Sequence, residues 1–359
     1  MGEVAERVLR AVDTPAVLVD LERVERNLAR GQALVAAAGL AARPHVKTHK
    51  IPAFAQRQLA LGAVGLTCQK VSEAEVFADA GCTDILIPYN ILGDTKLGRL
   101  HALARRVTLS VSADSLATLD GLSRWFDDPA HKLAVLVECD TGQHRCGVRA
   151  PEQTVELAQA IAARAGLSFA GLMTYPPRAK AAEVEAWLST ARDLCRQVGL
   201  PARVISNGGT PGLAEAGAVP AATEFRAGTY IYNDRSLVAK GLAGWGDCAL
   251  AVVTTVVSRP SADLAIIDAG SKILTSDLLG LTGYGYCPEY PGAVLRALNE
   301  EHGYLDLDRL AGRRPEVGEP LSIIPNHACV VSNMVDMVVP HRQGQMQAPL
   351  VVAARGKVA

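Results

Sequence analysis

The sequence predicts an α/β fold, a (β/α)8 barrel joined to a mainly β second domain. The first observation is a repeated unit: a short apolar run, a glycine-containing or polar loop, then a segment rich in Ala, Leu, Glu and Arg. Eight such units in about 200 residues suit a closed barrel better than an open doubly wound sheet. The second observation is that after about residue 240 short Val/Ile-rich runs alternate with Gly and Pro. We therefore expect the barrel at residues 22–237 and the second domain at 1–21 and 238–359.

Turn and periodicity signals place the elements in order. Asp13-Thr14-Pro15 predicts a turn into a buried strand at Ala16–Asp20, and the helical spacing after it predicts a helix that Gly39 ends. The barrel strands are expected at Ala42–Lys47, Ala63–Thr67, Asp84–Pro88, Val107–Val111, Leu133–Glu138, Phe169–Thr174, Arg203–Ser206 and Thr223–Arg226. The second domain should contain strands at Leu250–Ser258, Leu264–Asp268, Leu321–Pro325 and Ala348–Ala354.

Composition argues against several classes of protein. The net charge of −1 and the absence of long charged runs disfavour nucleic acid or an anionic membrane as partner. No stretch approaches the ~20 apolar residues that span a membrane, and the chain opens with an acidic residue, Glu3, so we expect a cytoplasmic protein. Eight cysteines without a CxxC pair predict free thiols, most of them buried.

The segment Arg43–Lys50 carries the strongest chemical signal. In an extended run His45, Lys47 and His49 share one face, so two imidazoles flank one ammonium group. Positive neighbours and partial burial both disfavour the protonated amine, and a neutral amine is what Schiff-base chemistry requires. The alternative interpretation is a solvated basic surface patch.

Polar residues also follow the ends of the other predicted strands, and in a barrel they would face the rim where barrel enzymes keep their active sites. They include Gln69, Tyr89, Glu138, Arg145, Tyr175, Asn207 and Tyr230. The loops Gly208-Gly209-Thr210 and Gly228-Thr229-Tyr230 each offer open backbone N–H groups and a hydroxyl before a helical segment. Each loop alone is more often a tight turn, but both lie where barrels commonly hold a phosphate.

A second motif lies in the β-rich part of the chain. His327 and Cys329 are two residues apart, on one face if the segment is extended. An imidazole and a thiolate suit zinc, although a structural histidine near a buried cysteine is the commoner meaning of so short a motif.

These motifs together resemble the fold-type III pyridoxal-phosphate enzymes of the alanine-racemase-like group, and within it the D-threonine aldolase and D-serine dehydratase family. The resemblance covers nearly all of the chain. It rests on Asp13–Pro15 with Asp20, Arg43–Lys50, Cys68–Glu75, Arg145–Val148, Gly208–Thr210, Arg226–Tyr230, Asp268–Gly270, His327–Cys329 and Ala353–Lys357.

The resemblance implies Lys47 as the Schiff-base lysine and Arg145 near the phenolic oxygen of the cofactor. Thr210, Gly228 and Thr229 would hold the phosphate, within a cofactor site that also contains Tyr175, Asn207, Gly208, Gly209, Arg226 and Tyr230. His45 and His49 are the candidate catalytic histidines, with metal-bound water as the alternative base, and Gln69 would face the amino-acid substrate. His327 and Cys329 would bind a divalent metal, zinc or manganese, beside the substrate's β-hydroxyl. The family also implies a homodimer in which each site is completed by the partner's β-domain.

The resemblance leaves three reactions open. Retro-aldol cleavage of a D-β-hydroxy-α-amino acid is favoured, because the blocks at Cys68–Glu75 and Arg145–Val148 and the Ala-Arg-Gly tail are aldolase-like. Dehydration of D-serine or a related hydroxy acid is the first alternative, because a His-x-Cys pair is the dehydratase-like version of the metal motif. The segment after Thr174-Tyr175 lacks the histidine that acts as base in family aldolases. Racemisation is the second alternative, and would need a further base opposite the lysine.

Overall fold

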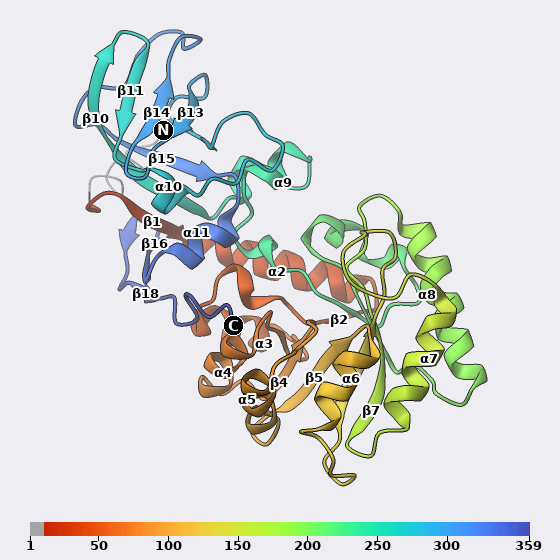
Figure 1. Cartoon of the computed structure of the whole chain (residues 1–359). Helices are drawn as coiled ribbons and strands as arrows, with labels where there is room; N and C mark the ends of the chain where they lie inside the picture. The colour runs from red at the N-terminus through yellow and green to blue at the C-terminus, as the bar shows by residue number, and fades with distance from the viewer. Residues whose placement is uncertain (1–10) are drawn as a thin grey trace. The chain divides into compact units, whose positions relative to one another are not determined.

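The structure is a computed structural model that describes residues 11–359, so residues 1–10 of the predicted second domain lie outside the described part. The chain forms two compact units, coloured along the sequence in Figure 1. The barrel unit comprises Ala29–Lys47, Pro52–Gly228 and Lys357–Ala359. The β unit comprises the described residues up to Leu28, Thr48–Ile51 and Thr229–Gly356. The predicted boundaries after residues 21 and 237 differ from these divisions and stay predictions.

The barrel unit contains the predicted eight-stranded parallel sheet, ordered β2-β9-β8-β7-β6-β5-β4-β3. Its strands are β2 (Ala41–Ala42), β3 (Leu66–Thr67), β4 (Asp84–Ile87), β5 (Thr108–Ala113), β6 (Leu133–Glu138), β7 (Leu167–Met173), β8 (Val204–Asn207) and β9 (Glu224–Phe225). A parallel bridge between His45 and Thr67 joins the two ends of this order, so the sheet closes on itself. The predicted (β/α)8 barrel is therefore confirmed.

Helices alternate with these strands, as the repeated pattern predicts. They are α3 (Pro52–Ala60), α4 (Val71–Asp79), α5 (Asp94–Ala104), α6 (Leu116–Ser123), α7 (Pro151–Ala162), α8 (Ala181–Gln197) and the 3-10 segment η2 (Thr210–Ala218). Their apolar faces supply the core; on α5, for example, Leu97, Leu100 and Leu103 recur every third residue and are all buried. The polar residues that follow the strands lie at the carboxyl rim of the barrel.

The first barrel strand differs from its prediction. Ala42–Lys47 was expected to be extended, but β2 ends at Ala42 and Val46–Thr48 forms the 3-10 turn η1. Strand alternation therefore does not place His45, Lys47 and His49 on one face. The turn forms because the backbone of Arg43 and His45 is still held by Phe225 and Ala227 of the neighbouring segment, whereas Lys47 N–H turns back to the His45 ring.

The β unit is built on a ten-stranded sheet whose main path is β13-β14-β11-β10-β1-β16-β17, with β15 joining β10 to β12 and β18 pairing with β16. Its strands are β1 (Ala16–Asp20), β10 (Leu250–Ser261), β11 (Leu264–Ile267), β12 (Gly285–Tyr286), β13 (Val294–Leu298), β14 (Gly303–Asp306), β15 (Pro320–Pro325), β16 (Met337–Arg342), β17 (Gln345–Met346) and β18 (Leu350–Val351). Strand β1 pairs antiparallel with β10 and parallel with β16, so the N-terminal strand joins the C-terminal third as predicted.

One predicted strand of this unit is largely wrong. Ala348–Ala354 was expected to be a strand, but only Leu350 and Val351 pair, with Val338 and Met337. The apolar run is cut short because the chain turns, and Arg355 N–H donates to Val352 O. The short helical segments here are η3 (Thr229–Ile231), α9 (Arg235–Ala239), η4 (Trp245–Asp247), α10 (Ser271–Leu274) and α11 (Ala328–Met334).

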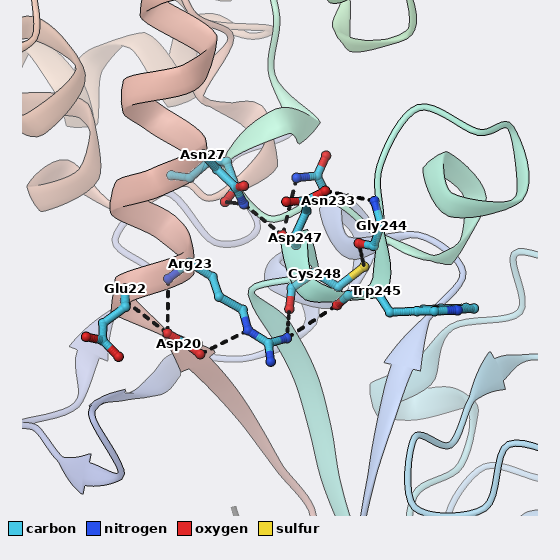
Figure 2. Close-up of polar contacts among 10 residues, drawn as sticks. Asp20, Glu22, Arg23, Asn27, Asn233, Gly244, Trp245, Asp247 and Cys248 are labelled. Atoms are coloured by element: carbon cyan, nitrogen blue, oxygen red, sulfur yellow. Dashed lines mark hydrogen bonds and ion pairs between the residues drawn. The ribbon is translucent and has the colours of Figure 1, made fainter. Parts of the chain in front are cut away.

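The first helix, α2 (Leu21–Ala37), begins in the β unit and fixes a long segment there (Figure 2). Asp20 Oδ1 caps it by accepting from the N–H groups of Glu22 and Arg23, both at 3.0 Å. Arg23 donates to Cys248 O at 2.8 Å, and Asn27 Nδ2 donates to Ile231 O and Asp247 O. The opening turns of α2 thus hold both ends of the segment from Ile231 to Cys248.

Two further predictions concern cysteines and membranes. All eight cysteines are free thiols, as predicted; Cys146 is exposed, Cys329 is half-buried and the others are buried. None of the helices within residues 11–359 is long and apolar enough to cross a membrane.

Candidate functional site

The barrel unit brings Lys47, His45 and Gln69 together at the carboxyl rim. Lys47 N–H donates to His45 Nδ1 at 3.4 Å, and His45 Nε2 lies 3.1 Å from Gln69 Oε1. Because Nδ1 accepts, the ring proton belongs on Nε2, from which it can donate to the amide oxygen. The same Gln69 oxygen also accepts from Lys47 Nζ at 3.4 Å. Gln69 therefore links the lysine to the histidine.

Of the two imidazoles predicted beside the lysine, His45 belongs to the same unit and contacts it. Lys47 is exposed, and this corrects the expectation of partial desolvation. His49 is fully buried and belongs to the β unit, where its Nδ1 accepts from Ile51 N–H at 3.0 Å. The place of His49 beside the lysine stays a prediction.

Three loops that follow consecutive barrel strands meet at Tyr175. The Arg145 guanidinium lies over the Tyr175 ring, 5.3 Å from its centroid. A Cβ atom on Gly209 would come within 2.6 Å of the same ring, so only glycine allows this approach. Gly208 has φ +93°, and a Cβ there would clash with the Phe225 ring. Arg145, Tyr175 and the first glycine loop are thus brought together as predicted.

The two glycine loops also approach each other. Gly228 N–H donates to Thr210 Oγ1 at 3.1 Å. At the end of β8, Asn207 is buried and its Oδ1 has no hydrogen-bond partner. An orphaned buried acceptor costs free energy unless a ligand or water satisfies it. Next to the two loops, Asn207 Oδ1 is thus a buried acceptor that a ligand or a water molecule could satisfy. Thr229 and Tyr230 open η3 in the β unit.

Charged groups lie beneath this rim. Arg226 is buried, and its guanidinium donates to Ser206 Oγ at 2.6 Å and Thr174 O at 2.7 Å. Burial lowers the pKa of Arg226 to about 10, although the charges of Glu224 and Glu138 oppose it. Burial, followed by the charge of Asp114, raises the pKa of Glu138. Arg226 is thus held in one orientation as a cation in a low-dielectric site.

The β unit holds the second group of predicted residues. His327 is extended at the N-cap of α11 and Cys329 lies in its first turn, so the expected extended segment is wrong. The pair nevertheless makes contact, because a hydrogen bond joins the imidazole and the thiol. Cys329 Sγ also lies 3.2 Å from Thr48 Oγ1 and 3.4 Å from Thr229 Oγ1. His327 Nδ1 lies 2.7 Å from Asp277 Oδ2.

These contacts favour a thiolate next to an imidazolium. Burial acts to raise the pKa of Cys329, but hydrogen bonding and charge from His327, with both threonine hydroxyls, lower it overall. Burial likewise acts to lower the pKa of His327, but Cys329, Asp277 and Asp234 raise it to about 9. Over residues 11–359 no group of three or more His, Cys, Asp or Glu side chains is arranged to hold a metal. The described residues thus bring one imidazole and one thiol into contact.

Sequence reasoning missed two carboxylates around this pair. Asp277 contacts His327 from 50 residues away, and Asp234 Oδ2 accepts from Ala328 N–H at 3.1 Å. No local sequence pattern predicts the role of Asp277, because its loop has no periodicity. Asp234 does have a signal, since Asp before Arg235-Ser236-Leu237 is a helix N-cap, and it caps α9 by accepting from Leu237 N–H.

Comparison with known proteins gives a consistent result. Residues 19–236 match the family model "Alanine racemase, N-terminal domain", and residues 249–340 match "Putative serine dehydratase domain". The D-threonine aldolase of Arthrobacter sp is 36% identical, over 97% of this chain and 94% of that protein. The crystal structure of D-threonine aldolase from Filomicrobium marinum superposes with a TM-score of 0.90 at 35% identity, covering 97% of each chain.

A dehydratase is almost as similar. The structure of a cysteine-to-alanine mutant of D-threo-3-hydroxyaspartate dehydratase, in the metal-free form, has a TM-score of 0.88 at 31% identity. It covers 96% of this chain and 98% of its own. A histidine-to-alanine mutant of the same enzyme, altered two positions earlier, has also been solved.

Proposed function

The chain belongs to the alanine-racemase-like family of fold-type III pyridoxal-phosphate enzymes, and we propose that it is a lyase cleaving D-β-hydroxy-α-amino acids to glycine and an aldehyde. Its reaction class is that of the named relatives, which are aldolases and dehydratases. The imidazole–thiol pair at His327 and Cys329 favours a lyase over a racemase, because a reaction at the β-hydroxyl benefits from a metal there and racemisation does not. The similarity to D-threonine aldolase, at 36% identity over 97% of the chain, carries the choice of cleavage over dehydration.

The residues of the barrel rim fit pyridoxal phosphate. Its pyridine ring, when bound, accepts the electron pair of whichever bond at Cα breaks. Lys47 would carry the cofactor, and Thr210, Gly228 and Thr229 would hold its phosphate. The tight approach of Gly209 to Tyr175, which only glycine allows, supports this assignment. The guanidinium groups of Arg145 and the buried Arg226 would supply positive charge to the anionic cofactor.

The β unit's ligand pair fits a divalent metal. A neutral imidazole and a thiolate are ligands that zinc prefers, and two protein ligands leave positions for a substrate hydroxyl. Such an ion, zinc or manganese, would act as a Lewis acid on the β-hydroxyl. Thr48, which contacts Cys329, directly follows Lys47 in the sequence, so the two groups of residues are adjacent along the chain.

The chain's own residues must also move a proton. Retro-aldol cleavage needs a base for the β-hydroxyl proton, and the segment after Tyr175 offers no histidine. Of the two predicted histidines we propose His45, because it contacts both Lys47 and Gln69. Its Nδ1 contact is long, 3.4 Å, so the ring can release it to accept a proton. Gln69 would then hold the Nε2 proton in place.

Dehydration is the second candidate. The dehydratase whose histidine and cysteine mutants were solved carries those residues two positions apart, as His327 and Cys329 are here, and its cysteine mutant is described as metal-free. In that reaction the hydroxyl leaves as water after loss of the Cα proton, and ammonia is released with a 2-oxo acid.

One assay separates the candidates. The protein, supplied with pyridoxal phosphate and Zn²⁺ or Mn²⁺, is incubated with D-threonine, D-serine, 3-hydroxy-D-aspartate and their L-enantiomers, and the products are identified. Glycine with acetaldehyde from D-threonine supports the aldolase. Formation of 2-oxobutanoate and ammonia without glycine contradicts it in favour of the dehydratase. A change in optical rotation without cleavage supports a racemase.

Assembly and location complete the proposal. We propose a homodimer, because the chain retains the whole β unit through which family members complete each other's sites. The substrate is a small amino acid, and the near-neutral net charge supports the expectation that nucleic acid and membranes are not partners. A cytoplasmic location remains part of the proposal.

A further inference from the structure

We infer that Asp277 is a positioning residue that fixes the ring of His327 for metal binding. The inference rests on the metal site of the proposed function. Asp277 Oδ2 lies 2.7 Å from His327 Nδ1, so Nδ1 donates and Nε2 becomes the nitrogen that can bind an ion. A carboxylate that accepts the second ring proton fixes the tautomer and the ring plane and raises the basicity of a histidine ligand.

The loop that carries Asp277 is held in a conformation that directs this carboxylate. Asp277 N–H donates to Thr275 Oγ1 at 3.0 Å. Thr275 has φ +66° and Leu279 has φ +51°, values that are unfavourable in residues with a Cβ and persist only where other contacts impose them. The strain therefore indicates that the position of Asp277 is determined by its surroundings.

Those contacts come from the residue just before His327. Asn326 is buried, and its Nδ2 donates to Asp277 O at 3.0 Å and to Gly283 O at 2.9 Å. Its Oδ1 accepts from Arg235 Nη1 at 3.0 Å, and Arg235 also donates to Thr282 O and Gly283 O. Asn326 thus ties the 277–283 loop to the segment that bears the histidine. Asp277 and His327 are positioned by one connected network.

The pair differs from an ordinary surface contact in its burial. The side chains of His327 and Asp277 are 30% and 41% exposed. A pair of the same type and distance, His131 and Asp128, is 84% and 54% exposed on the barrel unit. Asp128 therefore provides a matched control for removing a carboxylate from a histidine ring.

The test measures metal affinity of the full-length protein with Co²⁺ and Zn²⁺ alone, by competition with a chromophoric chelator. Co²⁺ bound to a thiolate also gives a sulfur-to-metal absorption band that reports Cys329 directly. We expect Asp277→Ala to weaken affinity roughly 10–100-fold and shift the band, as for other outer-sphere partners of metal ligands. Asp277→Asn, which keeps a neutral acceptor, should recover part of the loss, and Asp128→Ala should match wild type.

The outcomes separate this inference from the proposed function. The metal site, and the inference with it, is overturned if the wild-type protein binds no Co²⁺ or if the Cys329→Ala variant keeps the absorption band. Wild-type binding with unchanged affinity in Asp277→Ala overturns the inference alone. A lower melting temperature of metal-free Asp277→Ala without weaker binding likewise assigns Asp277 a structural role and overturns it.

Discussion

At the scale of single residues, one amide connects the lysine and the histidine of the barrel rim. Gln69 Oε1 meets both His45 Nε2 and Lys47 Nζ, so it is shared by the amine and the imidazole. Its own backbone N–H donates to Glu73 Oε2 at 2.6 Å, which fixes Gln69 at the start of α4. An exposed lysine is therefore given a defined direction by a neighbour that carries no charge.

Lys47 gives the first prediction. Lys47→Ala should lose the visible absorbance of lysine-bound pyridoxal phosphate and incorporate no cofactor on borohydride reduction, because the variant lacks the amine that bonds to it. Lys272→Ala removes an exposed lysine that pairs with Glu300 and Glu301, and should retain the wild-type spectrum. Absorbance spectra and the mass of the reduced protein measure both. A reducible adduct in Lys47→Ala would show that another lysine carries the cofactor.

At the scale of elements, the loop after β8 is shaped by two close approaches. Gly208 adopts φ +93° against Phe225, and Gly209 lies against Tyr175. Phe225 is the last residue of β9, and Tyr175 lies just after β7. A side chain at either glycine would therefore force one of these aromatic rings to move. The same glycines expose the backbone N–H groups that an anion needs.

The second prediction tests this loop. Gly208→Ala should lower the affinity for pyridoxal phosphate and the melting temperature, because it adds a clash to a backbone strain of roughly 1–3 kcal/mol. Gly246→Ala is the control, since no atom of another segment lies within 4 Å of the position that its methyl group would take, and its φ is not positive. Fluorescence titration and thermal unfolding measure the effects. Equal behaviour of the two variants would contradict a tightly constrained loop.

The third prediction concerns the start of α2. Asp20→Ala removes an N-cap and the 3.1 Å ion pair with Arg23, and should destabilise the protein by about 1–2 kcal/mol. Arg23 would also lose the partner that directs it to Cys248 O (Figure 2). Denaturant unfolding measures the loss. Asp336→Ala, which removes an ion pair between exposed side chains, should change stability by less than about 0.5 kcal/mol; an equal loss in both would argue against the cap.

At the scale of the whole molecule, the chain passes repeatedly between its two units. Thr48–Ile51 belongs to the β unit although barrel residues flank it on both sides. Lys50 explains this, because its Nζ donates to Ala354 O at 3.2 Å while Ala354 N–H donates to Lys50 O at 3.1 Å. Each unit is therefore built from several separate stretches of the chain, and a single cut cannot produce either unit intact.

The fourth prediction is the assembly. Light scattering at micromolar concentration should give the mass of two chains, and activity should fall on dilution below the dissociation constant, because the proposed dimer completes each site with the partner subunit. The measurement is made on the full chain with pyridoxal phosphate. A monomeric mass with full activity would exclude the shared site.

Local sequence patterns were sufficient to predict the architecture and most of the rim. Eight repeats of strand and helix predicted the barrel, since apolar periodicity is a local property that the closed sheet preserves. Residues at strand ends, such as Gln69, Tyr175 and Asn207, could be assigned to one rim because parallel strands share a direction.

The contacts on which the chemistry depends come from tertiary packing. Lys47 contacts His45 and Gln69 where the predicted strand gives way to a 3-10 turn, and its contact with Gln69 joins residues 22 positions apart. His327 and Cys329 meet across a helix start, and Asp277 reaches His327 from another loop. Local sequence patterns cannot predict such pairs. Contacts between side chains of distant segments are determined by the packing of the whole unit, and the periodicity of either segment does not encode them.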